Sequence, residues 1–360
     1  MISKQSKYFL FIFFVSFELF SNPIYTLDDL IDMANQANPV IDVIQAKQDA
    51  AKAGITVAEQ YLNPSVGLAV GPTKTRTPPT ENDKNWALGI SQPLEFSDVR
   101  RSRKDIAESN LEFVDELNRG TKINLLLSIK SAFYDVIHNQ EILKIADADQ
   151  QVIQDIRDRV ELRVNVGESP RYELIKADTE LLAAKRDAQA AKLRIQESKF
   201  FLKGLIGQNM PDDFDLEGKF PESNINISKS DVTDLIADSP RLKQLKAASS
   251  VFENKIKLEK NLVNPGVTLS AGVNQDPGIR NYTFGVSIPL PIWNQRQGQI
   301  GQAEANLREV EATYNQQSLL LKRDIDAAYQ RYLIAKEQVL TFEESLLAQA
   351  ESVLKVVEAA

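Results

Sequence analysis

The feature that most constrains this chain is an internal repeat. Asn38-Pro39 is followed by Asn63-Pro64, and Ser239-Pro240 is followed at the same spacing by Asn264-Pro265. The two sets lie about 200 residues apart, which indicates that one structural unit occurs twice along the chain. The repeat therefore predicts two similar halves, each built from the same order of elements.

A second pair of matching segments lies just downstream. Residues 86–94, WALGISQPL, match residues 282–290, YTFGVSIPL. The copies differ in length between the matched blocks, where residues 72–84 of the first copy correspond to the shorter 274–280 of the second. A length change confined to a short connection is typical of a duplicated β-hairpin.

The segments that flank the two connections alternate between apolar and small or polar residues. Period-two alternation predicts strands with two different faces. In a soluble sandwich the apolar face would be the core, whereas in a membrane barrel it would face lipid and the small face would line the lumen. The candidate lipid-facing residues are Val66, Leu68, Val70, Trp86, Leu88, Ile90, Val267, Leu269, Tyr282, Phe284, Val286 and Ile288.

Most of the remaining chain is predicted to be helical. Residues 98–163 contain no proline and a single glycine, Gly120, so they predict one helix of about 99 Å at 1.5 Å per residue. Such a helix is too long for an ordinary globular domain. A turn at 164–170 ends it, and a return helix is expected over 171–207. Another helix, at about 231–262, leads into the second hairpin.

These elements divide the chain as follows. Residues 1–21 form a leader, 22–207 form the first structural repeat with a hairpin at 63–94, and 208–235 form an equatorial linker segment. The second repeat covers 236–360, with a hairpin at 264–290 and a long helix at 294–360, and it lacks a return helix.

The leader is typical of a secretory signal peptide. Lys4 and Lys7 precede an apolar run at 8–17, and Ser21 is a small residue at a plausible cleavage point. An uncleaved anchor is the alternative, but about twenty apolar residues are needed to span a bilayer. No later segment approaches a membrane-spanning helix, so any contact of the mature protein with a membrane would use strands.

The composition argues against an enzyme, a metal site and a nucleic-acid-binding protein. The chain has no cysteine and one histidine, His138, and its net charge of −8 is spread without basic blocks, so a nucleic-acid partner is not expected. His138 lies three residues from both Asp135 and Glu141, but one histidine and two exposed acids are more often plain surface. We expect no enzyme activity, no cofactor and no metal site.

The repeat and its flanking segments resemble the TolC family of outer-membrane efflux proteins. The resemblance rests on the opening YTLDDLIDMANQANP at 25–39, the paired Asn-Pro strand starts, and the strand ends Gln92-Pro-Leu and Ile288-Pro-Leu-Pro. Residues 288–300 are also similar to the branch that serves cobalt, zinc, cadmium or copper pumps of the resistance-nodulation-division type, although drug ducts share much of this stretch.

The resemblance implies a fold, partners and a place in the cell. The fold is mainly helical with a membrane β-barrel part: a homotrimer whose subunits each give four strands to a 12-stranded barrel and long helical hairpins to a periplasmic tunnel. It implies a passive duct in the outer membrane of a Gram-negative bacterium. Small toxic solutes, either heavy-metal cations or drugs, would be driven through it by an inner-membrane pump acting through a periplasmic adaptor (membrane fusion protein).

The resemblance also assigns a role to the helix-hairpin turn. Gly167, Glu168, Ser169 and Pro170 would form the tip that docks the adaptor. Arg163 and Arg171 flank this tip and are candidates for ion pairs that hold a closed state.

Aromatic residues near the strand ends have two interpretations. Trp86, Tyr282 and Trp293 could lie at the membrane interface, or they could be packing residues.

Two further expectations concern alternatives and the C-terminus. The alternative function is a periplasmic coiled-coil scaffold with a soluble β-domain, rather like the adaptors themselves.

The second copy of the tip glycine would fall just beyond Ala360, and residues 351–360 still look helical. The repeat predicts at least ~40 further residues; a naturally shortened gene is the other reading.

Overall fold

The computed structural model describes residues 22–74, 82–220, 228–342, 349 and 352–353, and it is mainly helical. Its helices are α1 (Leu27–Ala37), α2 (Pro39–Glu59), α3 (Ser97–Asn165), α4 (Arg171–Ile206), α5 (Lys229–Asp234), the 3-10 helix η1 (Leu235–Asp238), α6 (Pro240–Asn261) and α7 (Gln297–Thr341). Its strands are β1 (Ile24–Tyr25), β2 (Ser65–Lys74), β3 (Asn82–Glu95), β4 (Asp215–Leu216), β5 (Gly266–Asp276) and β6 (Ile279–Ser287). The expected long helices and four alternating strands are confirmed.

Two prolines each begin a new helix. Asn38, before Pro39, has ψ 124° and separates α1 from α2. Ser239, before Pro240, has ψ 126° and separates η1 from α6, so the single helix expected at about 231–262 is wrong. The cause is the same at both sites, because the proline ring excludes the helical conformation from the residue before it.

One compact unit comprises the described residues up to Asn38 together with Leu126–Phe220. Its core contains Leu30 of α1, Phe133 of α3, Leu202 of α4 and Phe214, all of which are essentially inaccessible to solvent. β1 pairs in parallel with β4, and this small sheet was not predicted. Strands of two residues are too short to carry a periodic pattern, so the sequence gives no signal for them.

The ends of α1 and α4 meet within this unit. The side-chain amide of Asn38 donates to the carbonyl oxygen of Leu205 at 2.5 Å. Gly207 ends α4 with φ 116° and ψ −169°, a conformation that only glycine adopts readily. Asn38, in the first Asn-Pro pair of the repeat, thus connects the end of α1 to the end of α4.

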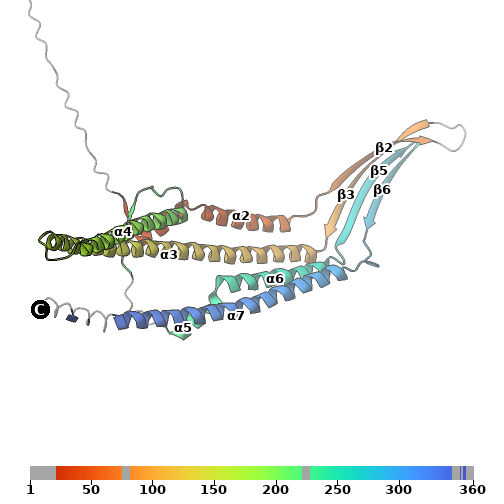
Figure 1. Ribbon diagram of the computed structural model, residues 1–360. Helices are drawn as coiled ribbons and strands as arrows, with labels where there is room; N and C mark the ends of the chain where they lie inside the picture. The colour runs from red at the N-terminus through yellow and green to blue at the C-terminus, as the bar shows by residue number, and fades with distance from the viewer. Residues whose placement is uncertain (1–21, 75–81, 221–227, 343–348, 350–351, 354–360) are drawn as a thin grey trace, which may run out of the picture. The chain divides into compact units, whose positions relative to one another are not determined.

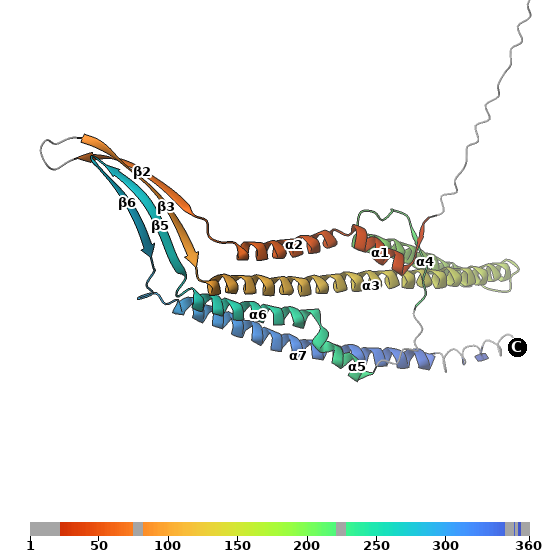
Figure 2. The same cartoon turned by 180° about the vertical axis from the view of Figure 1, so that it is seen from behind.

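The second compact unit comprises Pro39–Leu125 and the described residues after position 227. Four antiparallel strands form one sheet in the order β2-β3-β5-β6, and α6 lies along α7 (Figures 1 and 2). Asn261 and Asn254 of α6 donate to Ser102 and Ser109 of α3 at 3.0 Å each. These amide–hydroxyl bonds fix α6 beside the first turns of α3.

The second hairpin ends earlier than expected. β6 stops at Ser287, so Ile288 lies outside the strand, and α7 begins at Gln297 instead of residue 294. Pro289 and Pro291 follow directly, and proline has no N–H to donate to a strand ladder.

The leader at 1–21 and most of the chain beyond Phe342 lie outside the described residues. Among the helices that the structure describes, none is both long and apolar enough to cross a membrane.

Candidate functional site

The register of the sheet places the predicted apolar residues on one face. Val66 pairs with Ile90, which pairs with Ala271, which pairs with Phe284. The next row towards the hairpin turns contains Leu68, Leu88, Val273 and Tyr282. Residues that pair directly across strands point to the same side of a sheet. All the candidate residues within the strands therefore share one face.

The opposite face is made of small and uncharged polar side chains. One row contains Ser65, Ser91, Ser270 and Gly285. The next contains Gly67, Gly89, Gly272 and Thr283, and the third contains Ala69, Ala87, Asn274 and Asn281. We call these three rows the small-residue face. None of these side chains is charged, and none supplies a sulfur or imidazole ligand. The face can therefore contact water, but it does not form a tight metal site.

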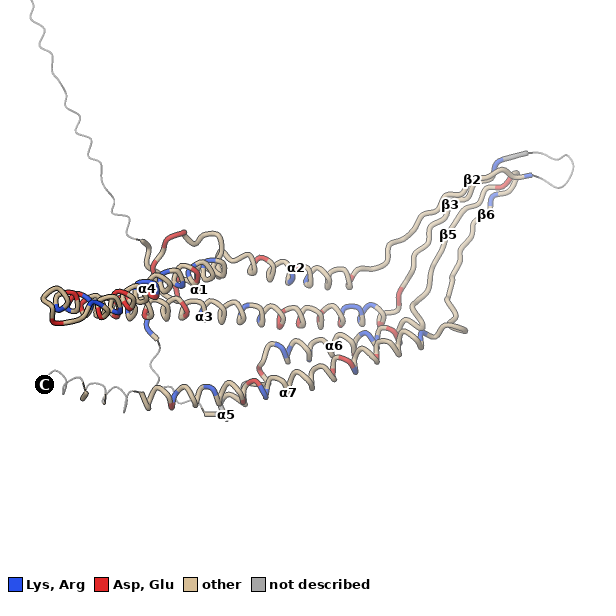
Figure 3. Tube along the Cα trace, viewed as in Figure 1, with Lys and Arg blue, Asp and Glu red and all other residues tan. Residues whose placement is uncertain are grey.

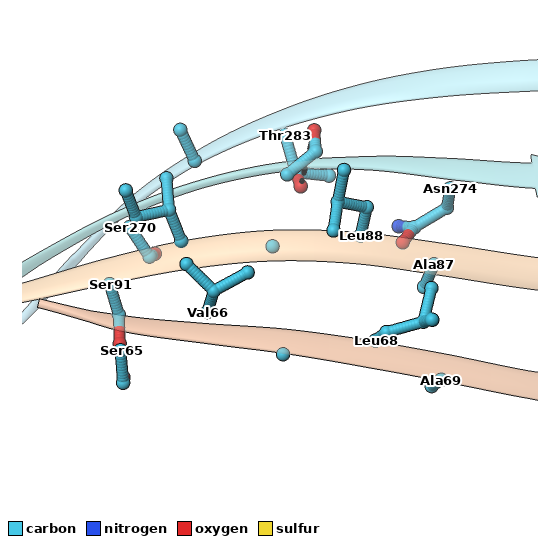
Figure 4. Close-up of a pocket in the computed structure, with 15 residues that line it drawn as sticks. Ser65, Val66, Leu68, Ala69, Ala87, Leu88, Ser91, Ser270, Asn274 and Thr283 are labelled. Carbon is cyan, nitrogen blue, oxygen red and sulfur yellow. Dashed lines mark hydrogen bonds between the residues drawn. The ribbon is translucent and has the colours of Figure 1, made fainter.

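Close packing explains glycine at two positions of the small-residue face. A Cβ atom on Gly285 would lie 2.7 Å from the Ser270 hydroxyl, whereas real Cβ contacts are longer. A Cβ on Gly272 would lie 3.2 Å from the carbonyl oxygen of Leu88. Ser65 and Ser91 exchange a hydrogen bond at 2.7 Å across the β2–β3 pair. Figure 4 shows the shallow hollow of about 480 Å³ that these strands line.

Charge is excluded from the middle of the sheet. Figure 3 shows the strands in the neutral colour over most of their length, with charged residues near the hairpin turns and where the strands meet helices. Near the turns, Arg280 lies in the same row of the apolar face as Trp86. Lys84 lies on the same face, one row closer to the turn. A neutral central band bounded by charge is the pattern expected of a strand segment that crosses a bilayer.

The predicted tip is a tight turn between α3 and α4. Gly167 has φ 82°, as expected for the residue that ends a helix. The carbonyl oxygen of Arg163 accepts hydrogen bonds from the backbone N–H groups of Glu168 at 2.8 Å and Ser169 at 3.2 Å. Ser169 is buried and Pro170 leads into α4, so among the four tip residues 167–170 Glu168 is the exposed polar side chain.

A different arginine joins the two helices behind the tip. Arg157 of α3 donates to Asp178 of α4 at 2.8 Å and also pairs with Asp158 and Glu161. These hydrogen bonds, above all the one to Asp178, raise the pKa of Arg157 further. Among the residues described, Arg163 and Arg171 form no ion pair within the chain. The contact between Arg157 and Asp178 spans a turn, and no local pattern predicts it.

An apolar groove follows the same hairpin. It encloses about 560 Å³ and is lined by Ile153, Ile156, Val160, Tyr172, Glu173, Lys176, Ala177 and Glu180. Tyr172 and Ile156 are more than half exposed. Exposed apolar patches of this kind, bordered by charges, mark surfaces that contact other proteins.

The remaining candidates are placed as follows. Trp86 and Tyr282 lie in neighbouring rows of the apolar face, and Trp293 is 92% exposed in the connection after β6. His138 is exposed on α3, and the described part of the chain holds no group of three metal-ligating residues. Arg296, which precedes α7 with φ 60°, pairs with Glu259 of α6. That pair was missed because its members lie far apart in sequence.

Comparison with known sequences gives a consistent result. The family described as Outer membrane efflux protein matches residues 30–208 and 232–360 in two blocks, as the repeat predicts. The cobalt-zinc-cadmium resistance protein CzcC of Cupriavidus metallidurans is 22% identical over 328 residues, covering 91% of this chain and 77% of CzcC. The outer membrane protein TolC of Vibrio cholerae is 22% identical over 324 residues, covering 84% and 71%.

Solved structures share the fold. CusC, whose crystal structures describe transmembrane channel formation, superposes with a TM-score of 0.71 at 16% identity, covering 95% of this chain and 85% of CusC. VceC, an outer membrane protein of Vibrio cholerae, superposes with a TM-score of 0.72 at 19% identity, covering 92% and 84%. At these identities the likeness concerns the fold alone.

Proposed function

We propose that this chain, which belongs to the outer membrane efflux protein family, exports divalent metal cations. Members of this family are non-enzymatic efflux channels of the Gram-negative outer membrane. Channels of this family form trimers in tripartite efflux systems. The soluble-scaffold alternative is wrong, because the family match covers both halves of the chain.

The channel wall that we propose is the two-faced sheet. The apolar face lies against lipid, and the small-residue face of β2, β3, β5 and β6 lines a water-filled lumen. Within the described chain β2 and β6 are the sheet edges. Unpaired strand edges are not stable in lipid, so three copies close a 12-stranded barrel by pairing β6 of one subunit with β2 of the next.

The tip of the α3–α4 hairpin is the proposed docking site of a periplasmic adaptor. Gly167, Glu168, Ser169 and Pro170 form the turn, and the groove that contains Tyr172 continues onto its flank. An inner-membrane pump of the resistance-nodulation-division type would supply the energy. Arg163 and Arg171 would reach carboxylates of neighbouring subunits when the tip is closed.

Metal cations are the cargo favoured by two observations. CzcC, which is 22% identical to this chain, is a cobalt-zinc-cadmium resistance protein. Residues 288–300 resemble ducts of that branch, although drug ducts share much of this stretch. The three rows of the small-residue face hold no charged side chain, so a hydrated cation meets no tight ligand that would retain it. Recognition of the cargo would belong to the pump.

Growth of a deletion strain tests the cargo. Loss of the gene should lower the tolerated concentration of Co²⁺, Zn²⁺, Cd²⁺ or Cu²⁺ by several fold while tolerance to hydrophobic drugs stays the same. Complementation should restore growth on metal. Equal metal tolerance with loss of drug tolerance would show that the channel serves a drug pump instead.

We also propose that the leader at 1–21 is removed during export. Protein sequencing of the mature N-terminus would check this, with Asn22 expected as the first residue.

A further inference from the structure

A concave basic pocket lies where β3 passes into α3. It encloses about 390 Å³ and is lined by Glu59, Tyr61, Ser97, Arg100, Arg101 and Lys104. Figure 3 shows the cluster of basic residues at the start of α3. None of these residues takes part in the proposed lumen, sheet edges or tip.

Arg100 and Tyr61 form the wall of the pocket. The guanidinium carbon of Arg100 lies 4.1 Å from the centre of the Tyr61 ring, and Tyr61 is 73% exposed. A cation–π contact at this distance holds the guanidinium beside the ring. The planar donor set of arginine suits a pair of phosphate oxygens.

The pocket carries an excess of positive charge. Lys104 pairs with Glu59 at 2.7 Å, and this hydrogen bond raises the pKa of the lysine. Arg101 has only a long contact with Asp98, at 3.6 Å, with both side chains mostly exposed. Among the residues described, Arg100 forms no ion pair. Three cations and one carboxylate line the pocket, and two further carboxylates, Asp98 and Glu108, lie 3.6 Å from Arg101 and 3.7 Å from Lys104. The cation that attracts an anion is therefore Arg100.

The pocket lies at the edge of the apolar face of the sheet. Leu94 belongs to that face, where it pairs with Val267. Glu95 belongs to the other face and pairs with Arg103 at 2.6 Å. Arg101 precedes Arg103 by two positions, so it projects roughly 160° around the helix from it, whereas Arg100 precedes it by three positions and projects only about 60° from it. The pocket therefore extends around the helix from the side of Arg103 to the opposite side. The exposed Phe96 lies in sequence between the end of β3 and the pocket residue Ser97.

We infer that this pocket binds the phosphate of an anionic phospholipid in the periplasmic leaflet of the outer membrane. The inference rests on the proposed lipid-facing assignment, which puts the helix side of the sheet at the height of the periplasmic headgroups. Tyrosine beside arginine and lysine is the composition found where proteins meet lipid headgroups. Each trimer would hold three such lipids, with acyl chains along the apolar rows.

Native mass spectrometry of the full-length trimer in mild detergent tests the inference. Phosphatidylglycerol and phosphatidylethanolamine are added in parallel titrations. The wild type should retain up to three phosphatidylglycerol molecules in preference to phosphatidylethanolamine. Arg100→Gln with Arg101→Gln should weaken phosphatidylglycerol retention at least about tenfold, since each basic residue near a lipid surface contributes to binding.

A control pair at the other end of the strands makes the test specific. Lys84→Gln with Arg280→Gln removes the same charge and should leave phosphatidylglycerol retention unchanged. Equal loss in both double variants, no loss in the first, or preferential retention of lipopolysaccharide would overturn the assignment. If the first double variant does not assemble, Arg100→Gln alone should still weaken retention, because among the residues described Arg100 forms no ion pair that the substitution would break.

The same spectra separate this inference from the proposed function. A trimer mass without selective phosphatidylglycerol binding would refute the pocket alone. A stable monomer would refute the barrel and, with it, the position of the pocket in the membrane.

Discussion

A Cβ atom on Gly207 would lie 2.7 Å from the carbonyl oxygen of Ala37. Gly207 ends the return helix and Ala37 ends the first helix, so their backbones touch where the two helices meet. Because Asn38 also donates to Leu205 here, the contact joins the end of α1 to the end of the first repeat. No side chain larger than that of glycine fits between them without a shift of backbone.

Replacement of Gly207 by alanine should therefore destabilise the folded protein by about 1–3 kcal/mol, the range for a strained backbone conformation. Gly204, three residues earlier in α4, provides the matched control, because a Cβ there has nothing within 4 Å. Gly204→Ala should be neutral or stabilising by up to about 0.5–1 kcal/mol. Thermal unfolding of the purified trimer, followed by circular dichroism, measures both; equal effects would contradict the packing argument.

Arginine substitutions test which face of the sheet contacts lipid. Leu88→Arg or Phe284→Arg should block assembly far more than Ser91→Arg, because a lipid-facing charge costs roughly 2–4 kcal/mol at mid-bilayer. Phe284 is 87% exposed in the single chain, and Ser91 lies on the small-residue face. Heat-resistant trimer in isolated outer membranes is the measurement. Equal tolerance of arginine on both faces would rule out the lipid-facing assignment.

The tip turn should tolerate only residues that accept a positive φ. Gly167 has φ 82° and open space around its Cβ position, so the backbone conformation alone limits substitution. Gly167→Val should impair efflux while leaving outer-membrane insertion intact, whereas Gly167→Asn should be milder because asparagine adopts this region more readily. Metal tolerance and trimer abundance are measured together. Loss of insertion in the valine variant would indicate a folding role instead.

The arginines beside the tip should matter in the assembled trimer. Combined Arg163→Gln and Arg171→Gln should loosen the closed mouth and raise sensitivity to large antibiotics that the outer membrane normally excludes. Arg157→Gln serves as the comparison, because Arg157 pairs with Asp178 inside one hairpin. Unchanged antibiotic sensitivity in the first variant, with trimer present, would remove both arginines from the gate.

Acid should weaken the contact between α4 and β4. The hydrogen bond from Lys199 lowers the pKa of Asp215 below its ordinary value of 3.8. A carboxyl group with a lowered folded pKa contributes stability above that ordinary value and loses it as the pH falls through the lowered one. Asp215 is half exposed, so solvent screening limits the contribution to about 0.2–1 kcal/mol.

Lys199→Met should accordingly flatten the loss of stability below about pH 4. Lys192→Met, an exposed lysine on the same helix, is the control and should leave the acid limb unchanged. Thermal unfolding across pH 2–6 gives the comparison. An identical acid limb in wild type and Lys199→Met would show that another carboxyl group governs it.

The sequence by itself determined the repeat, the long helices and the two faces of each strand. Alternation of Val66, Leu68 and Val70 with small residues is a local property that a strand expresses directly, because successive side chains point to opposite sides. The glycine that ends α3 and the proline that begins α4 are local signals too. The domain limits and the roles of the individual site residues stay predictions.

Only the tertiary structure decided which segments meet. Three contacts join residues that have no fixed spacing in sequence. They are the β1–β4 pair, the hydrogen bond from Arg157 to Asp178 and the cation–π contact of Arg100 with Tyr61. The register between β3 and β5 brings the two repeats into one sheet and aligns their apolar rows. Such pairings depend on chain closure over long distances, where many alternatives share the same local pattern, and packing selects among them.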